Sequence, residues 1–141
     1  MNLRLMIAGL MAIMLVIPGM ATAGDIIIIG NKSVAESKLD KGDLKKIYLG
    51  NKTTWSDNKK IVFVTQDDTT ISDEFLKEYV NKSASQFSSY WKAKVFSGKG
   101  TPPKSFASDS ELVQYIAQTD GAVGYVSSNE GLDNVKIITV E

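Results

Sequence analysis

The segment "DIIIIG", residues 25–30, decides the fold class of this chain. Its four consecutive isoleucines are β-branched, have the length of a strand and are apolar on both faces. A strand with one face in water alternates apolar and polar residues, whereas a strand covered on both faces stays apolar throughout. The segment therefore predicts a buried strand within an α/β sheet.

Helical and strand patterns alternate along the rest of the chain. In order, the sequence predicts a helix between Asp40 and Gly50, a strand at 61–64, a helix capped by Thr70 or Ser72, a helix opened by Ser83 and Gln86, a weakly signalled strand at 104–108, a helix opened by Ser108 and Glu111, and strands at 122–126 and 135–140. Residues 31–39 are predicted to form a loop. No repeat or linker interrupts the series, so we expect one three-layer α/β domain.

Two segments contain aromatic residues, and the sequence predicts burial for one of them but leaves the other open. Phe87, Tyr90, Trp91 and Val95 recur at helical spacing and are predicted to face the core. Trp55 stands among polar turn residues, where an exposed aromatic side chain can mark a contact surface. It could equally fold back onto the preceding helix, and the sequence leaves both interpretations open.

The first 23 residues have the pattern of a cleavable secretory signal peptide. Arg4 precedes an apolar run from Leu5 to Ile17, and residues 21–23 read Ala-Thr-Ala, a typical cleavage site. The apolar run is short for a membrane span. We therefore expect export to the periplasm and a single mature domain over residues 24–141.

Composition excludes much chemistry from that domain. The whole chain has no Cys and no His, its single Arg lies in the leader, and its 16 basic residues balance its 16 acidic ones. Disulfides, the usual zinc sites and Ser-His or Cys-His nucleophile pairs cannot be built from these residues. The balance of charge gives no electrostatic reason to bind nucleic acid.

The loop "VFSGKGTPPKSF", residues 95–106, contains glycine, lysine and a hydroxyl, as phosphate-binding loops do. A nucleotide-binding loop needs Ser or Thr after the lysine, a strand before it and a helix after it. Here Gly100 follows Lys99, a predicted helix precedes the loop, and two prolines follow. The loop is better explained as a helix end and a stiff exit to the next strand.

The loop "TQDDTTISDEF", residues 65–75, is the better candidate for binding an anion. It joins a strand end to a helix start, where free N–H groups and the helix dipole favour negative charge. Thr69, Thr70 and Ser72 add hydroxyl donors, and these three residues are the predicted ligand-binding set.

Four carboxylates in the same loop oppose that prediction. Asp67, Asp68, Asp73 and Glu74 repel a free anion, unless one of them accepts a proton from it. The alternative is that they are helix-capping and solvated residues. A calcium loop is disfavoured because the EF-hand spacing and its central glycine are missing.

Three segments together resemble the periplasmic phosphate-binding proteins of ABC transporters. Residues 39–64, "LDKGDLKKIYLGNKTTWSDNKKIVFV", resemble the pattern L-s-x-x-x-L-x-x-I-f-L-G-k-x-x-x-W-x-d-g-x-x-I of that family. Residues 87–103, "FSSYWKAKVFSGKGTPP", and 119–127, "TDGAVGYVS", resemble its later Trp-containing helix and its t-x-G-A-I-G-Y-v signature. The three segments occur in the family's order.

The resemblance implies one lobe of a type II periplasmic binding protein fold, with a mixed sheet flanked by helices. Full-length members have two lobes around a ligand cleft, and this chain resembles the second lobe alone. The family's Ser-Gly-Thr loop, preceded by Arg, corresponds here to residues 67–72, which keep the hydroxyls of Thr69, Thr70 and Ser72 but lack the Gly and the Arg.

We also expect a function without catalysis and without a cofactor or bound metal. The expected role is that of a substrate-binding-like protein that takes phosphate or another small anion and works with a membrane transporter or sensor. The alternative is an interaction or sensory module that has lost its ligand and contacts a membrane-bound partner. An enzyme is the weakest hypothesis, because the sequence does not pair one carboxyl group as a general acid with another as a general base.

Overall fold

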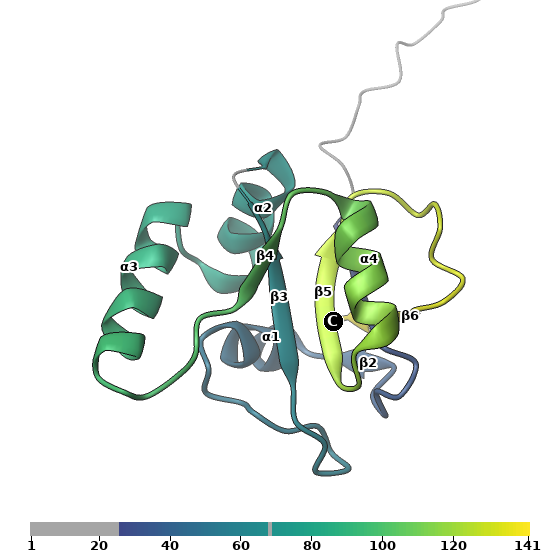
Figure 1. The fold of residues 1–141 in the computed structure, drawn as a ribbon, viewed down its shortest axis with the longest axis horizontal. Helices are drawn as coiled ribbons and strands as arrows, with labels where there is room; N and C mark the ends of the chain where they lie inside the picture. The colour runs from purple at the N-terminus through teal and green to yellow at the C-terminus, as the bar shows by residue number, and fades with distance from the viewer. Residues whose placement is uncertain (1–25, 68) are drawn as a thin grey trace, which may run out of the picture.

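The computed structural model describes residues 26–67 and 69–141, which form one sheet and its surrounding helices (Figure 1). The elements are β1 (Ile27–Gly30), β2 (Lys38–Leu39), α1 (Lys41–Tyr48), β3 (Val62–Gln66), α2 (Thr70–Phe75), the π-helical turn η1 (Leu76–Val80), α3 (Ala84–Phe96), β4 (Lys104–Phe106), α4 (Asp109–Gln118), β5 (Ala122–Val126) and β6 (Lys136–Val140). The predicted leader, residues 1–23, lies outside the described residues. Among the described helices, none has the length and apolar character needed to span a membrane.

The sheet has six strands in the order β2-β6-β1-β5-β3-β4. β1 runs antiparallel to both of its neighbours, β5 and β6, whereas β2 with β6, β3 with β5 and β3 with β4 are parallel pairs. The sheet is therefore mixed, as the resemblance implies. The strongly apolar β1 lies between β6 and β5, away from either edge.

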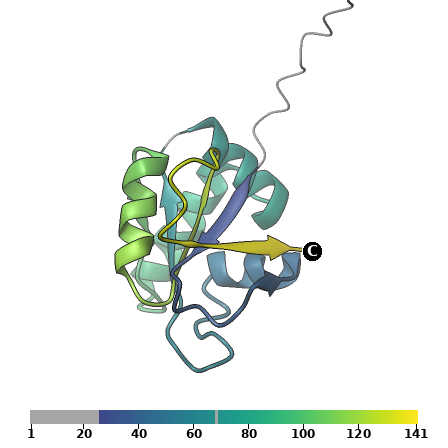
Figure 2. The ribbon, with the colours of Figure 1, turned by 90° about the vertical axis from the view of Figure 1, so that its right-hand side faces the viewer.

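The isoleucines of β1 reach two separate cores because alternate side chains of a strand point to opposite faces. Ile28 belongs to a cluster with Tyr48 of α1 and Phe75 of α2, whereas Ile29 packs with Leu112 of α4 on the other face. Figure 2 shows α4 and α1 on opposite sides of the sheet. The predicted three-layer arrangement is confirmed.

The predicted helix starts are mostly confirmed by their capping bonds. Asp40 caps α1 by accepting from the Asp43 N–H at 2.6 Å. Ser83 and Gln86 form a reciprocal capping box at the start of α3. Ser108 caps α4. Each of these capping bonds joins residues that are close in the chain, so the local sequence sets where these helices begin.

The predicted caps of α2 were wrong by one to three residues. Thr69, rather than Thr70 or Ser72, is the N-cap, and its hydroxyl accepts from the Ser72 N–H at 3.2 Å. Thr69 keeps extended backbone angles, so the helix begins only at Thr70. Ser72 lies on the buried side of the first turn of α2, and its hydroxyl does not cap the helix.

Two further predictions are corrected at the edges of the sheet. The predicted loop at 31–39 contains β2, a two-residue strand that pairs with β6. Val95 does not face the core and is 39% exposed. α3 lies beside the edge strand β4 and buries mainly Phe87 and Trp91, which leaves Val95 on its last turn outside the core (Figure 1).

Trp55 is buried, which excludes the interpretation as an exposed contact residue. Its side chain is only 2% exposed and belongs to the same core cluster as Ile47 of α1. The indole Nε1 donates to the carbonyl of Gly121 at 2.9 Å. Gly121 has a φ of +72°, and a Cβ there would lie 2.2 Å from the Lys60 carbonyl oxygen. The polar turn therefore folds back over the start of β5.

Candidate functional site

The carboxyl ends of three parallel strands meet at one edge of the sheet. β3 runs parallel to β4 on one side and to β5 on the other, α2 begins after β3, and α4 begins after β4. In open α/β sheets this is the edge where ligands bind. The first N–H groups of each helix have no acceptor within the helix and favour negative charge.

Thr69 and Thr70 lie together at this edge. They line a hollow of about 420 Å³ whose wall also includes Gln66 and Ser127. The Thr69 hydroxyl is engaged as the cap of α2 and lies 3.5 Å from the Gln66 side-chain oxygen. Thr70 is exposed. Of the predicted set, these two residues are the ones that share a hollow.

Ser72 is separated from that hollow because its hydroxyl belongs to a buried network. It is 6% exposed and accepts from the Tyr125 phenol at 2.9 Å. The same phenol accepts from the Gln66 N–H at 3.0 Å. Burial raises the pKa of Tyr125, so the phenol stays neutral at physiological pH and remains a donor. Ser72 lines a groove on the other side of the β3 end.

Asp109 is a central residue of this edge that the sequence did not single out. One of its carboxylate oxygens accepts from the Ser127 N–H at 3.1 Å, the Ser127 hydroxyl at 2.8 Å and the Ser128 N–H at 3.1 Å. The other accepts from the Gln66 side-chain amide at 2.5 Å. Its only sequence signal is an acidic residue directly after the Ser108 cap. A carboxylate of the chain itself thus occupies four donors where an external anion could bind.

The acidic residues of the loop surround the edge without forming a cation site. Asp67 and Asp73 are exposed and Glu74 is half-buried, while Asp68 lies outside the described residues. Across residues 26–67 and 69–141, no group of His, Cys, Asp or Glu side chains is arranged to hold a metal ion.

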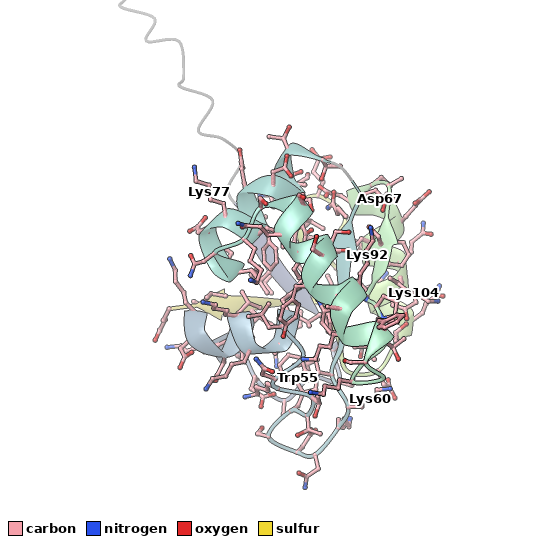
Figure 3. The ribbon with its side chains drawn as sticks, turned by 90° about the vertical axis from the view of Figure 1, so that its left-hand side faces the viewer. Trp55, Lys60, Asp67, Lys77, Lys92 and Lys104 are labelled. Carbon is pink, nitrogen blue, oxygen red and sulfur yellow. The ribbon has the colours of Figure 1, made fainter. Side chains whose placement is uncertain are left out.

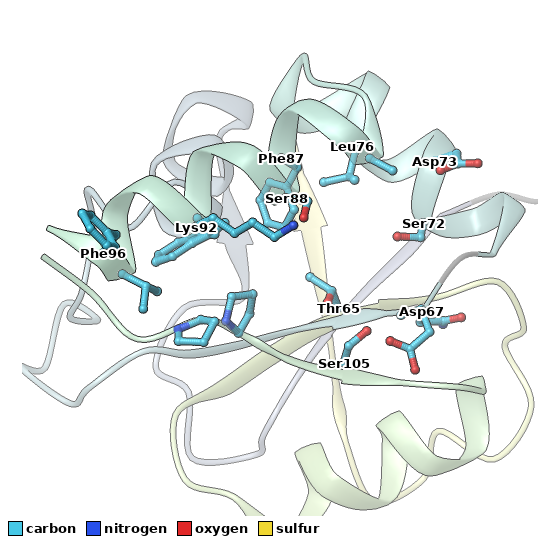
Figure 4. Close-up of a pocket in the computed structure, with 16 residues that line it drawn as sticks. Thr65, Asp67, Ser72, Asp73, Leu76, Phe87, Ser88, Lys92, Phe96 and Ser105 are labelled. Carbon is cyan, nitrogen blue, oxygen red and sulfur yellow. The ribbon is translucent and has the colours of Figure 1, made fainter. Parts of the chain in front are cut away.

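A larger groove runs from the β3 end along α3. Its volume is about 930 Å³, and its floor and walls come from β3, β4, α3 and the two prolines before β4. Figure 3 shows the side of the molecule that carries it, with Lys92 on α3 and Asp67 at the strand end. Figure 4 shows Thr65, Ser105 and Asp67 across from α3. The sequence did not predict this groove, because it depends on how far α3 stands from the sheet edge.

Comparisons with known proteins agree with this architecture. Residues 20–139 match the family described as the PBP superfamily domain. The comparison with curated proteins finds no significant match.

Solved structures of similar fold come from phosphate transport systems. A protein from Clostridium perfringens, described as a phosphate ABC transporter substrate-binding protein with bound phosphate, has a TM-score of 0.65 at 20% identity, covering 83% of this chain and 45% of its own. An ABC-type phosphate transport receptor from Vibrio cholerae gives 0.63 at 19% identity, covering 83% and 46%. PstS from Borrelia burgdorferi gives 0.63 at 15% identity, covering 84% and 47%. The chain therefore spans about half the length of these proteins and has the fold of one of their lobes.

Proposed function

Because the chain belongs to the PBP superfamily, we propose that it is a substrate-binding-like protein rather than an enzyme, and that it binds phosphate or another small anion. The proposed site is the hollow at the carboxyl ends of β3 and β5, lined by Thr69 and Thr70. Ser72 acts from the adjacent buried network by fixing the first turn of α2 through Tyr125.

One observation carries this proposal. The two threonines and the first turn of α2 stand at the edge of parallel strands where α/β folds place their ligands. Hydroxyl groups and helical N–H groups can both donate to an oxyanion, and neither requires an arginine. The protein from Clostridium perfringens was solved with bound phosphate, and its similar fold supports an anion as the ligand proposed here.

A lone lobe covers only one side of its ligand, so we expect weak binding unless a partner covers the other side. A membrane transporter or sensor that meets the carboxyl edge of the sheet would supply that cover. We further propose that the partner is met in the periplasm, after removal of residues 1–23. The mass of the chain recovered from a periplasmic extract tests this, and a chain that retains Met1 would refute it.

Calorimetric titration of the exported protein with inorganic phosphate tests the ligand. We expect a dissociation constant on the order of 1 mM, with a rise in melting temperature at saturating phosphate. Thr70→Ala should weaken binding without loss of stability, whereas Ser89→Ala, an exposed serine on α3, should leave it unchanged. Absence of both heat and thermal shift at millimolar phosphate would refute anion binding by the isolated chain.

Asp109 favours a second candidate, an interaction or sensory module that needs no ligand. Its carboxylate already accepts from Gln66, Ser127 and Ser128, so these donors have an anionic partner without an added anion. Crosslinking in the periplasm discriminates between the two functions. A membrane partner captured equally by wild type and by a Thr69→Ala, Thr70→Ala double variant would support the ligand-free module.

A further inference from the structure

The groove along α3 goes beyond the strand-end hollow, and its walls are mostly apolar. Leu76, Phe87 and Trp91 form the side beneath α3, and Pro102 and Pro103 form the opposite side. Its volume of about 930 Å³ falls at the upper end of the roughly 300–1,000 Å³ typical of small-molecule sites. An organic molecule, rather than a single inorganic ion, matches a groove of this size and lining.

The far end of the groove exposes apolar side chains to an unusual extent. Phe96 is 96% exposed and Val95 is 39% exposed, both on the last turn of α3. Figure 4 shows Phe96 at this end of the groove. Neither belongs to the two core clusters of the described residues. An apolar body lying against Phe96, Val95 and Pro102 would remove this surface from water, which is favourable.

Lys92 supplies the polar recognition element. It is the one cationic side chain among the groove-lining residues, and it makes none of the ion pairs found in the described residues. Figure 4 shows its ammonium group reaching from α3 into the groove beside Ser88. Ser105 lines the facing wall. An ammonium group with one hydroxyl beside it and another on the facing wall is suited to a carboxylate.

The charges at the near end limit the ligand to a single negative group. Asp67 and Asp73 line the groove beyond Lys92, so a second anionic group there would meet two carboxylates. Addition of an extended peptide to β4 is disfavoured, because Pro103 precedes the strand and β4 is only three residues long.

We propose that the groove along α3 binds a free organic monocarboxylate with an unbranched or aromatic apolar body. The carboxylate lies at Lys92 with Ser88 and Ser105, and the apolar body lies against Trp91, Phe96 and the proline wall. Charge complementarity at Lys92 and the exposed last turn of α3 carry the assignment.

Nuclear magnetic resonance of the exported protein tests the proposal with octanoate as the probe. Trp91 lines the groove, and its indole N–H, bonded to the Tyr48 carbonyl at 3.0 Å, reports on the position of its ring. The Trp55 indole N–H, bonded to Gly121, belongs to a residue outside the groove and serves as the internal reference. We expect octanoate to shift the Trp91 signal with a dissociation constant on the order of 1 mM and to leave the Trp55 signal in place. Octylammonium and octanedioate should each bind at least about fivefold more weakly.

Three variants distinguish a specific site from general adsorption to apolar surface. Lys92→Gln should weaken octanoate binding about fivefold. Lys77→Gln, at an exposed lysine outside the groove, should leave it unchanged. Phe96→Ser removes a side chain with no core contact, so the variant should stay folded and bind more weakly.

The proposal is overturned if octanoate moves both indole signals equally, if octylammonium binds as well as octanoate, or if Lys92→Gln and Lys77→Gln behave alike. Failure of phosphate binding in the calorimetric titration does not affect it, because the two ligands occupy different sites. Octanoate binding that persists when phosphate saturates the hollow would support two separate sites, whereas loss of octanoate under those conditions would contradict them.

Discussion

Replacing Asp109 by alanine should both destabilise the fold and open an anion site. The substitution removes the acceptor of three bonds from Ser127 and Ser128 and of one from Gln66. Charge-assisted hydrogen bonds contribute about 1.5–3 kcal/mol each when buried, but exposed ones only about 0.2–1 kcal/mol. Since Ser127 is exposed and water can replace the lost acceptor, we expect a total loss of about 2 kcal/mol, or about 8 °C in melting temperature.

Calorimetry in chloride and in phosphate at equal ionic strength is the assay. The freed N–H and O–H groups should donate to phosphate oxygens, so phosphate should raise the melting temperature of Asp109→Ala more than that of wild type. Glu111→Ala is the matched control, because Glu111 is an exposed acid in the same first turn of α4 with no comparable side-chain bonds. Equal losses in the two variants, or equal responses of Asp109→Ala and wild type to phosphate, would refute the reasoning.

Three other predictions test the fold. Gly121→Ala should destabilise by more than about 3 kcal/mol in urea unfolding, because it combines a positive φ with a Cβ placed 2.2 Å from the Lys60 carbonyl oxygen. Burial raises the pKa of both Tyr48 and Tyr125, so the stability that these neutral phenols contribute is fully present below the unfolded-state pKa of about 10 and should be lost as pH rises from there through their folded pKa values. Unfolding free energies measured at a series of alkaline pH values check this. They should fall less steeply with pH in Tyr125→Phe than in wild type. Ser83→Ala should cost about 1 kcal/mol by removing the capping box of α3, and a change within experimental error would contradict that value.

The elements that the sequence predicted well are those set by local chemistry. The paired apolar faces of Ile28 and Ile29 required helices on both sides of the sheet, and both core clusters are present. The caps at Asp40 and Ser83 depend on residues three positions apart, so a short window contains the whole signal.

The candidate site was harder to predict because its bonds join distant parts of the chain. Asp109 looks like an ordinary first-turn acid until β5 brings Ser127 to it. Ser72 looks like a free hydroxyl in the sequence, and its partner Tyr125 comes from β5, more than fifty residues later. Trp55 has polar neighbours in sequence, yet its partner is Gly121, which is brought close only by folding.

The position of β1 has a consequence for the time course of folding. Ile28 pairs with Tyr125 and Ile138, so the first described strand finds both of its neighbours about a hundred residues later in the chain. The central ladder cannot close while those residues are still being synthesised, and closing such a large loop makes folding slow. The native ladder of β1 therefore stays open until residues 123–138 have been synthesised. If residues 1–23 act as the export leader that we propose, this delay would keep the domain from becoming compact while the leader acts.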